Sequence, residues 1–201
     1  MLSRRAIIEG AAGIAALALL GGGARALAGE GGLLRPPGAQ DEAALLGACL
    51  RCDRCRSVCA TDAIDLAVVE DGLLQVSTPK MNFRLGYCNE CDGAWKCRTA
   101  CPTAAIGAFD KTTQRLGLAV VDPEVCLTYG ISGFCSGKCI DPCPEDALFF
   151  NDAGRLEVRN ELCWGCGACE YFCISDSYGA YSGSIRRGIN IEPVTTFTKE
   201  A

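Results

Sequence analysis

The chain contains no histidine, and several classes of functional site need that residue. A Ser/His/Asp or Cys/His catalytic site is excluded because its general base is an imidazole. Haem held by histidine and Rieske-type centres are excluded for the same reason. Any bound metal is therefore expected to be held mainly by sulfur.

Aromatic residues and clusters of positive charge are also scarce. Two Trp and seven Phe in 201 residues allow only a modest apolar core. A formal net charge of −5, without long basic runs, argues against nucleic acid as a partner. The sequence shows no nucleotide-binding motif and no acid/base pair, so we do not expect an autonomous enzyme.

Cysteine, by contrast, is abundant, and the sixteen cysteines fall into four motifs of four. The first and fourth motifs share the spacing C-x2-C-x2-C-x3-C, so the chain contains an internal repeat of one cysteine motif. The second motif reads C-x2-C-x5-C-x3-C-P and the third reads C-x8-C-x3-C-x3-C-P. In order, the motifs are Cys49, Cys52, Cys55 and Cys59; Cys88, Cys91, Cys97 and Cys101; Cys126, Cys135, Cys139 and Cys143; and Cys163, Cys166, Cys169 and Cys173.

This spacing is typical of the ligands of 4Fe–4S clusters. Two-residue gaps let a tight loop point successive thiolates at the corners of one cube, and the fourth cysteine usually reaches a second cluster. We expect that fourth cysteine to begin a short helix, because proline after it suits a first helical turn. The sequence thus predicts four 4Fe–4S clusters with all sixteen cysteines as ligands.

Two other uses of cysteine are weighed against this one. A disulfide framework is conceivable in an exported protein, but disulfides usually join distant segments and close longer loops. Four-cysteine zinc sites use two C-x2-C pairs separated by a longer spacer, which these motifs do not match. Cluster binding therefore remains the favoured interpretation.

Repeated segments after the fourth cysteines predict β-hairpins. Residues 59–64, 101–106 and 143–148 each lead into a stretch with the composition of paired strands. The clearest hairpin spans residues 148–158, where residues 151–154 supply turn chemistry.

Five further residues are candidates for contact with the clusters. Ile64, Ile106 and Leu148 are expected to pack against cluster faces and exclude water. In the fourth motif, Gly165 and Gly167 are expected to let backbone amides approach the inorganic sulfides.

The expected fold is α+β, built from bacterial-ferredoxin-like modules with short antiparallel hairpins and short helices around the clusters. Consecutive motifs could pair to give two modules in tandem. Alternatively, the second and third motifs could form a module nested between the first and the fourth. Both arrangements use the same sixteen ligands, and the spacing leaves the choice open.

The N-terminus has the features of an export signal. Arg4 and Arg5 precede an apolar run over residues 11–23, and small residues follow at 26–28. The run is too short to span a bilayer comfortably, so we expect cleavage near Gly29, with an uncleaved anchor as the alternative. The arginine pair resembles a twin-arginine signal, whose pathway exports folded proteins with their cofactors. This predicts a periplasmic protein.

The predicted organisation has four parts. An export signal covers residues 1–28, and a linker with a short helix covers 29–48. The four-motif iron–sulfur domain covers 49–176. A polar C-terminal tail covers 177–201, in which residues 189–194 are expected to form one edge strand that ends near proline.

The motifs resemble those of bacterial ferredoxins, and most of the chain resembles a narrower group. The segment Leu34-Arg-Pro-Pro-Gly-Ala39, an acidic and apolar helix, and then the first motif are similar to the NapG/MauM family of ferredoxin-type proteins. The resemblance also covers the signal, the order of the motifs and the C-P-x-x-A segments at 101–105 and 143–147.

Membership of that family implies four 4Fe–4S clusters in a periplasmic protein. The resemblance further implies a membrane-bound ferredoxin-type quinol dehydrogenase as electron donor, with membrane association through this partner. Electrons would pass to a periplasmic redox acceptor, such as a nitrate reductase system. Two alternatives stay open: an iron–sulfur subunit of a stable molybdenum-type oxidoreductase complex, and a metal-storage protein without a redox partner.

Overall fold

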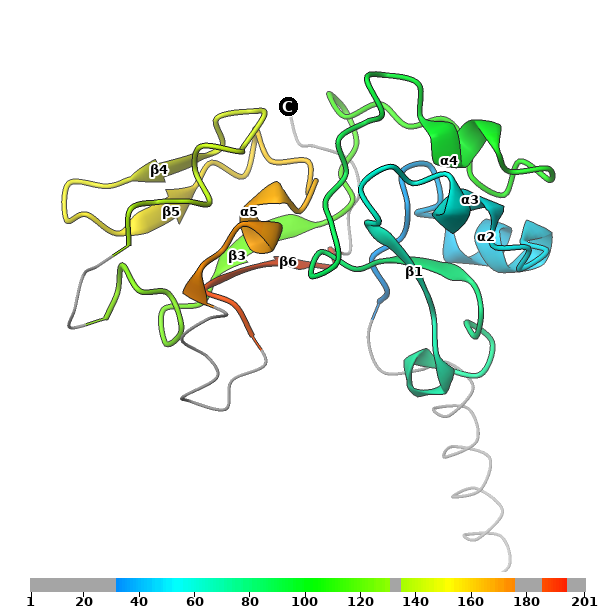
Figure 1. The fold of residues 1–201 in the computed structure, drawn as a ribbon, viewed down its shortest axis with the longest axis horizontal. Helices are drawn as coiled ribbons and strands as arrows, with labels where there is room; N and C mark the ends of the chain where they lie inside the picture. Colours follow the sequence, from blue (N-terminus) through cyan, green and yellow to red (C-terminus); the bar gives the residue numbers. More distant parts are fainter. Residues whose placement is uncertain (1–31, 131–134, 176–185, 195–201) are drawn as a thin grey trace, which may run out of the picture.

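The computed structural model describes residues 32–130, 135–175 and 186–194 (Figure 1). The predicted export signal lies outside these residues, as does part of the predicted tail. No helix within the described ranges is long and apolar enough to cross a bilayer.

The described chain combines short helices with three two-stranded antiparallel sheets, β1–β2, β3–β6 and β4–β5. Figure 1 shows α2, α3, α4 and β1 gathered in one half, and α5 with the strands β3 to β6 in the other. The predicted mixture of short helices and antiparallel hairpins is confirmed. The elements are α2 (Glu42–Ala48), α3 (Arg54–Ser57), β1 (Ile64–Leu66), η1 (Val69–Asp71), β2 (Pro79–Met81), α4 (Lys96–Thr99), β3 (Leu118–Val121), β4 (Leu148–Phe150), β5 (Leu156–Val158), α5 (Ala168–Tyr171) and β6 (Ile189–Glu192).

Two of the three predicted hairpins form. β1 pairs with β2, and Ile64 lies opposite Met81. β4 pairs with β5 across the turn at residues 151–154, where the Asn151 amide donates to the Arg155 carbonyl. In that turn Gly154 has φ +70°, a left-handed conformation that glycine adopts without steric cost.

The prediction of a third hairpin after Ile106 is wrong. The backbone there bonds to distant segments: the Gly107 amide donates to Gly38 and the Leu116 amide donates to Trp164. β3 then pairs with β6, with Val121 opposite Ile189. The strand predicted in the tail is confirmed, and it ends before Pro193, which has no amide to give to a ladder.

In the first, second and fourth motifs a short helix lies before the fourth cysteine, which corrects the prediction that the helices begin at that cysteine. Helices α3, α4 and α5 contain the third cysteines Cys55, Cys97 and Cys169. The chain after Cys101 and Cys143 forms turns instead. Amides of the three residues 103, 105 and 106 donate to the Cys101 sulfur, so they are not available to a helix.

The buried Arg35 binds the segment before α2 to α2 and β2. It is 3% exposed and forms an ion pair with Glu42 at the start of α2. Its guanidinium also donates to the Thr78 hydroxyl (2.9 Å) and the Pro79 carbonyl (2.7 Å). One side chain thus joins the entering segment, α2 and β2.

The Arg35→Lys variant is expected to unfold more easily, by about 2 kcal/mol, because an ammonium cannot reproduce the planar fork of donors at a buried site. Denaturant unfolding measures this difference. Arg159→Lys is the matched control, since the exposed guanidinium of Arg159 donates to the Asp146 carbonyl (3.1 Å) and lies over the Phe149 ring (4.3 Å to the centroid), without a buried ion pair. Equal unfolding free energies for the two variants would contradict this role of Arg35.

The core contains sulfur as well as hydrocarbon. Its largest fully buried side chains include Trp164, Leu45, Leu116 and Leu156. Six cysteines are buried among them: Cys97, Cys126, Cys139, Cys163, Cys166 and Cys169. The apolar residues therefore pack around thiols and not only against one another.

Candidate metal centres

All sixteen cysteines lie in the described residues and carry free thiols. The structure brings them together in four thiol groups, each with three cysteines from one motif and one from the neighbouring motif. We number each group by the motif that supplies three. Group 1 is Cys49, Cys52, Cys55 and Cys101; group 2 is Cys88, Cys91, Cys97 and Cys59; group 3 is Cys126, Cys135, Cys139 and Cys173; and group 4 is Cys163, Cys166, Cys169 and Cys143.

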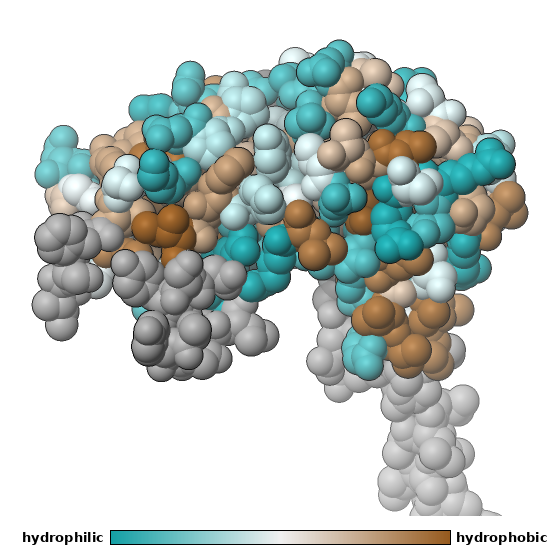
Figure 2. Space-filling model, viewed as in Figure 1, coloured by the Kyte–Doolittle hydropathy of each residue, from teal (hydrophilic) through white to brown (hydrophobic). Residues whose placement is uncertain are grey.

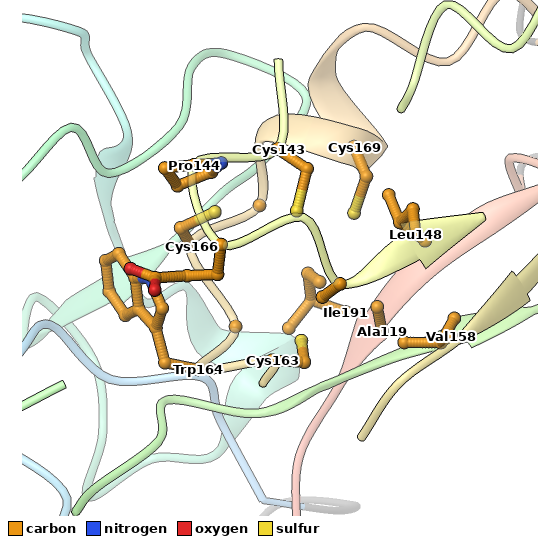
Figure 3. Close-up of a pocket in the computed structure, with 14 residues that line it drawn as sticks. Ala119, Cys143, Pro144, Leu148, Val158, Cys163, Trp164, Cys166, Cys169 and Ile191 are labelled. Atoms are coloured by element: carbon orange, nitrogen blue, oxygen red, sulfur yellow. The ribbon is translucent and has the colours of Figure 1, made fainter. Parts of the chain in front are cut away.

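Group 4 shows the arrangement most clearly (Figure 3). Its four sulfurs point toward one space. Leu148 and Ile191 line the same space, and Trp164 closes one side. Four thiols therefore converge in a largely apolar setting.

Groups 1 and 2 line comparable spaces in the first half. The space at group 1 is also lined by Leu45 and Ile106. The space at group 2 is also lined by Ile64 and Trp95.

Group 3 is identified through its buried member, Cys139. Burial, together with the nearby sulfurs of Cys173, Cys135 and Cys126, raises the pKa of this thiol to about 12. Those three cysteines therefore lie near Cys139.

The groups exchange their fourth cysteines between consecutive motifs. Cys59 and Cys101 are exchanged between the first and second motifs. Cys143 and Cys173 are exchanged between the third and fourth. The sequence left open whether the motifs pair in tandem or in a nested order. In the structure, the first motif shares cysteines with the second and the third with the fourth, which is the tandem order.

Burial makes the bare thiolates unfavourable. It raises the pKa of Cys55 and of Cys166 to about 12, that of Cys97 to about 11, and that of Cys169 well above the usual thiol range. A metal centre would supply the positive charge that stabilises these thiolates. Four sulfurs around one space, all but that of Cys52 at least partly buried, therefore fit an iron–sulfur cluster in donor chemistry.

The spacing of these side chains differs from that of a mononuclear site. Within the described ranges, no three Cys, Asp or Glu side chains converge closely enough to hold a single metal ion. The sulfurs of groups 1, 2 and 4 surround a space and do not meet at a point.

Left-handed residues shape the cysteine loops of the first and fourth motifs at equivalent positions. Arg51 and Asp53 have φ of 53° and 61°, and Gly165 and Gly167 have 85° and 82°. These turns aim amides inward, as where the Arg51 amide donates to the Cys49 sulfur (3.4 Å). The loop conformation therefore does not by itself demand glycine.

Close neighbours explain why the fourth motif uses glycine. A Cβ on Gly165 would lie 2.6 Å from the Gly117 carbonyl oxygen, and one on Gly167 would lie 2.0 Å from the Phe83 ring. Both glycines line the space at group 4. Whether their amides reach inorganic sulfide stays a prediction.

The three apolar candidates each lie at a thiol group. Ile64 lines the space at group 2, Ile106 that at group 1 and Leu148 that at group 4. All three are at most 4% exposed. They are therefore placed to keep water from the sulfurs.

Sequence reasoning missed a set of hydroxyl groups beside the sulfurs. Thr103 lies 3.7 Å from the Cys101 sulfur and Ser175 lies 3.1 Å from that of Cys173. In each case the hydroxyl residue stands two positions after the cysteine, a spacing that the sequence displays. Hydrogen bonds to sulfur raise the reduction potential of iron–sulfur clusters, so these residues bear on redox tuning.

The groups are linked in the order 1, 2, 4, 3. Groups 1 and 2 take Cys55 and Cys59 from one short segment, and groups 4 and 3 take Cys169 and Cys173 from another. Groups 2 and 4 are joined directly, because the Cys88 amide donates to the Cys166 carbonyl (2.8 Å).

Comparison with known proteins identifies the family. The ferredoxin-type protein NapG of Escherichia coli (strain K12) is 33% identical over 193 residues, which cover 85% of this chain and 79% of NapG. The chain belongs to the NapG/MauM family of ferredoxin-type proteins. The methylamine utilization ferredoxin-type protein MauM of Methylophilus methylotrophus, also in this family, is 34% identical over 154 residues, covering 71% of this chain and 66% of MauM.

A further relative is the ferredoxin-type protein NapF of Escherichia coli (strain K12), which is 31% identical over 147 residues. These cover 70% of this chain and 79% of NapF. No family model and no solved structure matches the chain. As a member of the NapG/MauM family, the protein has an iron–sulfur electron-transfer role.

Proposed function

We propose that the protein is a periplasmic electron carrier with four 4Fe–4S clusters, arranged as two bacterial-ferredoxin-like modules in tandem. Thiol groups 1 and 2 would hold the clusters of one module, and groups 4 and 3 those of the other. The clusters supply centres that gain and lose single electrons. The observation that carries the proposal is the exchange of fourth cysteines between consecutive motifs.

Apolar side chains help to keep water from three of the four centres. Ile64, Ile106 and Leu148 cover the sulfurs of groups 2, 1 and 4 with hydrocarbon. Backbone amides donate to sulfur, as those of Glu90 and Ala168 do to Cys88 and Cys166. Such hydrogen bonds stabilise the negative charge that reduction adds.

The electron donor in this proposal is a membrane-bound ferredoxin-type quinol dehydrogenase, and the acceptor is a periplasmic reductase or dehydrogenase system such as nitrate reductase. The arginine pair and the short apolar run at the N-terminus support export to the periplasm. Family membership supports a role beside redox partners.

Group 1 offers a contact face for such a partner. Cys52 is exposed, and its neighbour Leu50 is 65% exposed. Arg51 donates to the carbonyls of Leu74 and Val76 (both 2.9 Å), which ties this loop to the one after η1. Exposed apolar side chains gather around η1 (Figure 2), among them Val69 and Leu74 at 60% and 51% exposure.

A Leu50→Glu variant should therefore accept electrons more slowly from membranes that contain the quinol dehydrogenase. We expect a several-fold lower rate of cluster bleaching with quinol, and unchanged bleaching with dithionite. Leu85→Glu is the control, because Leu85 is 54% exposed but does not line any of the spaces described at groups 1, 2 and 4. Absence of quinol-dependent bleaching in the unmodified protein would overturn the proposed donor.

The alternative is an iron–sulfur subunit held permanently in a molybdenum-type oxidoreductase complex. A stable stoichiometric complex on purification would favour it. Isolation as a free chain that quinol-linked membranes reduce would favour the carrier.

A further inference from the structure

The two halves of the chain meet between groups 2 and 4. The amide of Cys88 in group 2 donates a hydrogen bond to the carbonyl of Cys166 in group 4 (2.8 Å). One hydrogen bond therefore joins members of two different thiol groups. Bonded paths of this kind couple redox sites far better than a gap through space or water.

Aromatic side chains from groups 2 and 4 also contact each other. Trp95 lines the space at group 2, and Trp164 lines the space at group 4. Their ring centroids are 6.4 Å apart in an edge-to-face arrangement. Phe109 contacts both, at 5.5 and 5.9 Å. Trp95 takes a left-handed conformation (φ 43°), a strained position that packing against these rings supports.

Lys111 forms ion pairs with both halves at the same junction. Lys111 lies in the segment between the second and third motifs, and its Nζ is 2.7 Å from Glu90 and 2.9 Å from Glu145. Glu90 lines the space at group 2, whereas Glu145 lines the space at group 4. One positive charge is thus shared by carboxylates that belong to the two halves.

We propose that Lys111 is a positioning residue that holds groups 2 and 4 together and raises the reduction potential of both centres, so that electrons cross between the halves at this junction. The inference rests on the proposed function. One electron crosses at a time, one side being oxidised as the other is reduced, and no proton or bond is transferred. The four centres then act as one series and not as two separate pairs.

The expected sign follows from charge. A positive group stabilises the electron-rich reduced state, and a negative group destabilises it. In Lys111→Met the two carboxylates lose their shared cation, so the potentials of the two inner centres should fall. Lys111→Arg keeps the charge and should restore them.

Two variants identify the outer centres independently. Thr103→Val removes a hydroxyl beside Cys101 in group 1, and Ser175→Ala removes one beside Cys173 in group 3. Each should lower one potential, because a hydrogen bond to sulfur is lost. The two reduction potentials that neither variant changes then belong to the centres at groups 2 and 4.

Lys80→Met is the matched control for loss of a partly buried, paired lysine. Lys80 pairs with Asp71 and is 19% exposed, against 33% for Lys111. Its neighbours Pro79 and Met81 line the spaces at groups 1 and 2. Because side chains alternate along a strand, Lys80 points away from both spaces.

The test is a potentiometric titration of the full cluster-loaded protein and these variants, followed by EPR. We expect Lys111→Met to lower the reduction potentials of the two centres that the Thr103 and Ser175 variants leave unchanged. Lys111→Arg should restore these potentials, and Lys80→Met should change none of the four. No shift, an equal shift of all four, or a shift confined to the other two centres would overturn the inference. Lack of clusters in the unmodified protein would instead overturn the proposed function.

Discussion

Replacing Cys59 and Cys88 together with serine is expected to remove about four irons per chain, no more than either replacement alone, because both belong to one four-cysteine cluster site. Replacing Cys55 and Cys59 together is expected to remove about eight, because these neighbours serve two sites. Both expectations follow from the cysteines that line the spaces at groups 1 and 2. Iron and acid-labile sulfide analysis of anaerobically purified protein gives the counts.

The comparison separates exchanged ligands from sequential ones. If each motif held its own cluster, the Cys55/Cys59 pair would lose about four irons and the Cys59/Cys88 pair about eight. The single variants serve as controls, since they show whether loss of one cluster also empties its neighbour. The reversed pattern of iron loss would contradict the thiol groups described above.

The Gly165→Ala variant is expected to lose on the order of 3 kcal/mol of unfolding free energy, combining backbone strain with overpacking. Its new Cβ would meet the Gly117 carbonyl oxygen at 2.6 Å and the Gly117 amide nitrogen at 2.7 Å. Both are backbone atoms of the segment that leads into β3, so neither can rotate away. Denaturant unfolding of the cluster-loaded protein measures the loss.

Gly154→Ala separates the two causes. Gly154 also has a left-handed φ, +70° against +85° for Gly165, but no heavy atom lies within 4 Å of its added Cβ. We expect only the conformational cost, about 1 kcal/mol. If the two variants lost equal stability, the close approach of Gly117 would play no part.

Features encoded within one short segment were predictable from the sequence. The hairpin of β4 and β5 depends on turn residues at 151–154, and the strand β6 on an apolar pattern that ends at Pro193. The helix before the first motif was predicted from the same kind of local pattern. Membership of the NapG/MauM family followed from motif order and the segment at residues 34–39.

Features that depend on distant partners were not predictable. β3 pairs with β6 about seventy residues later, and no local pattern names that partner. The helices were expected after the fourth cysteines, but amides there turn toward sulfur, as at Cys101. The need for glycine at Gly165 comes from Gly117, and the role of Lys111 from Glu90 and Glu145. The amides beside Cys101 are local competitors of a helix, whereas the contacts of β3, Gly165 and Lys111 join segments that the sequence separates widely.

The most direct test of the whole account is the iron and acid-labile sulfide content of the anaerobically purified protein, with EPR after reduction. Four clusters, each held by four cysteines, predict about sixteen irons and sixteen sulfides per chain, with spectra that show interaction between neighbouring centres. Little iron, with zinc in its place or with the thiols oxidised, would contradict the account and remove the basis for electron transfer.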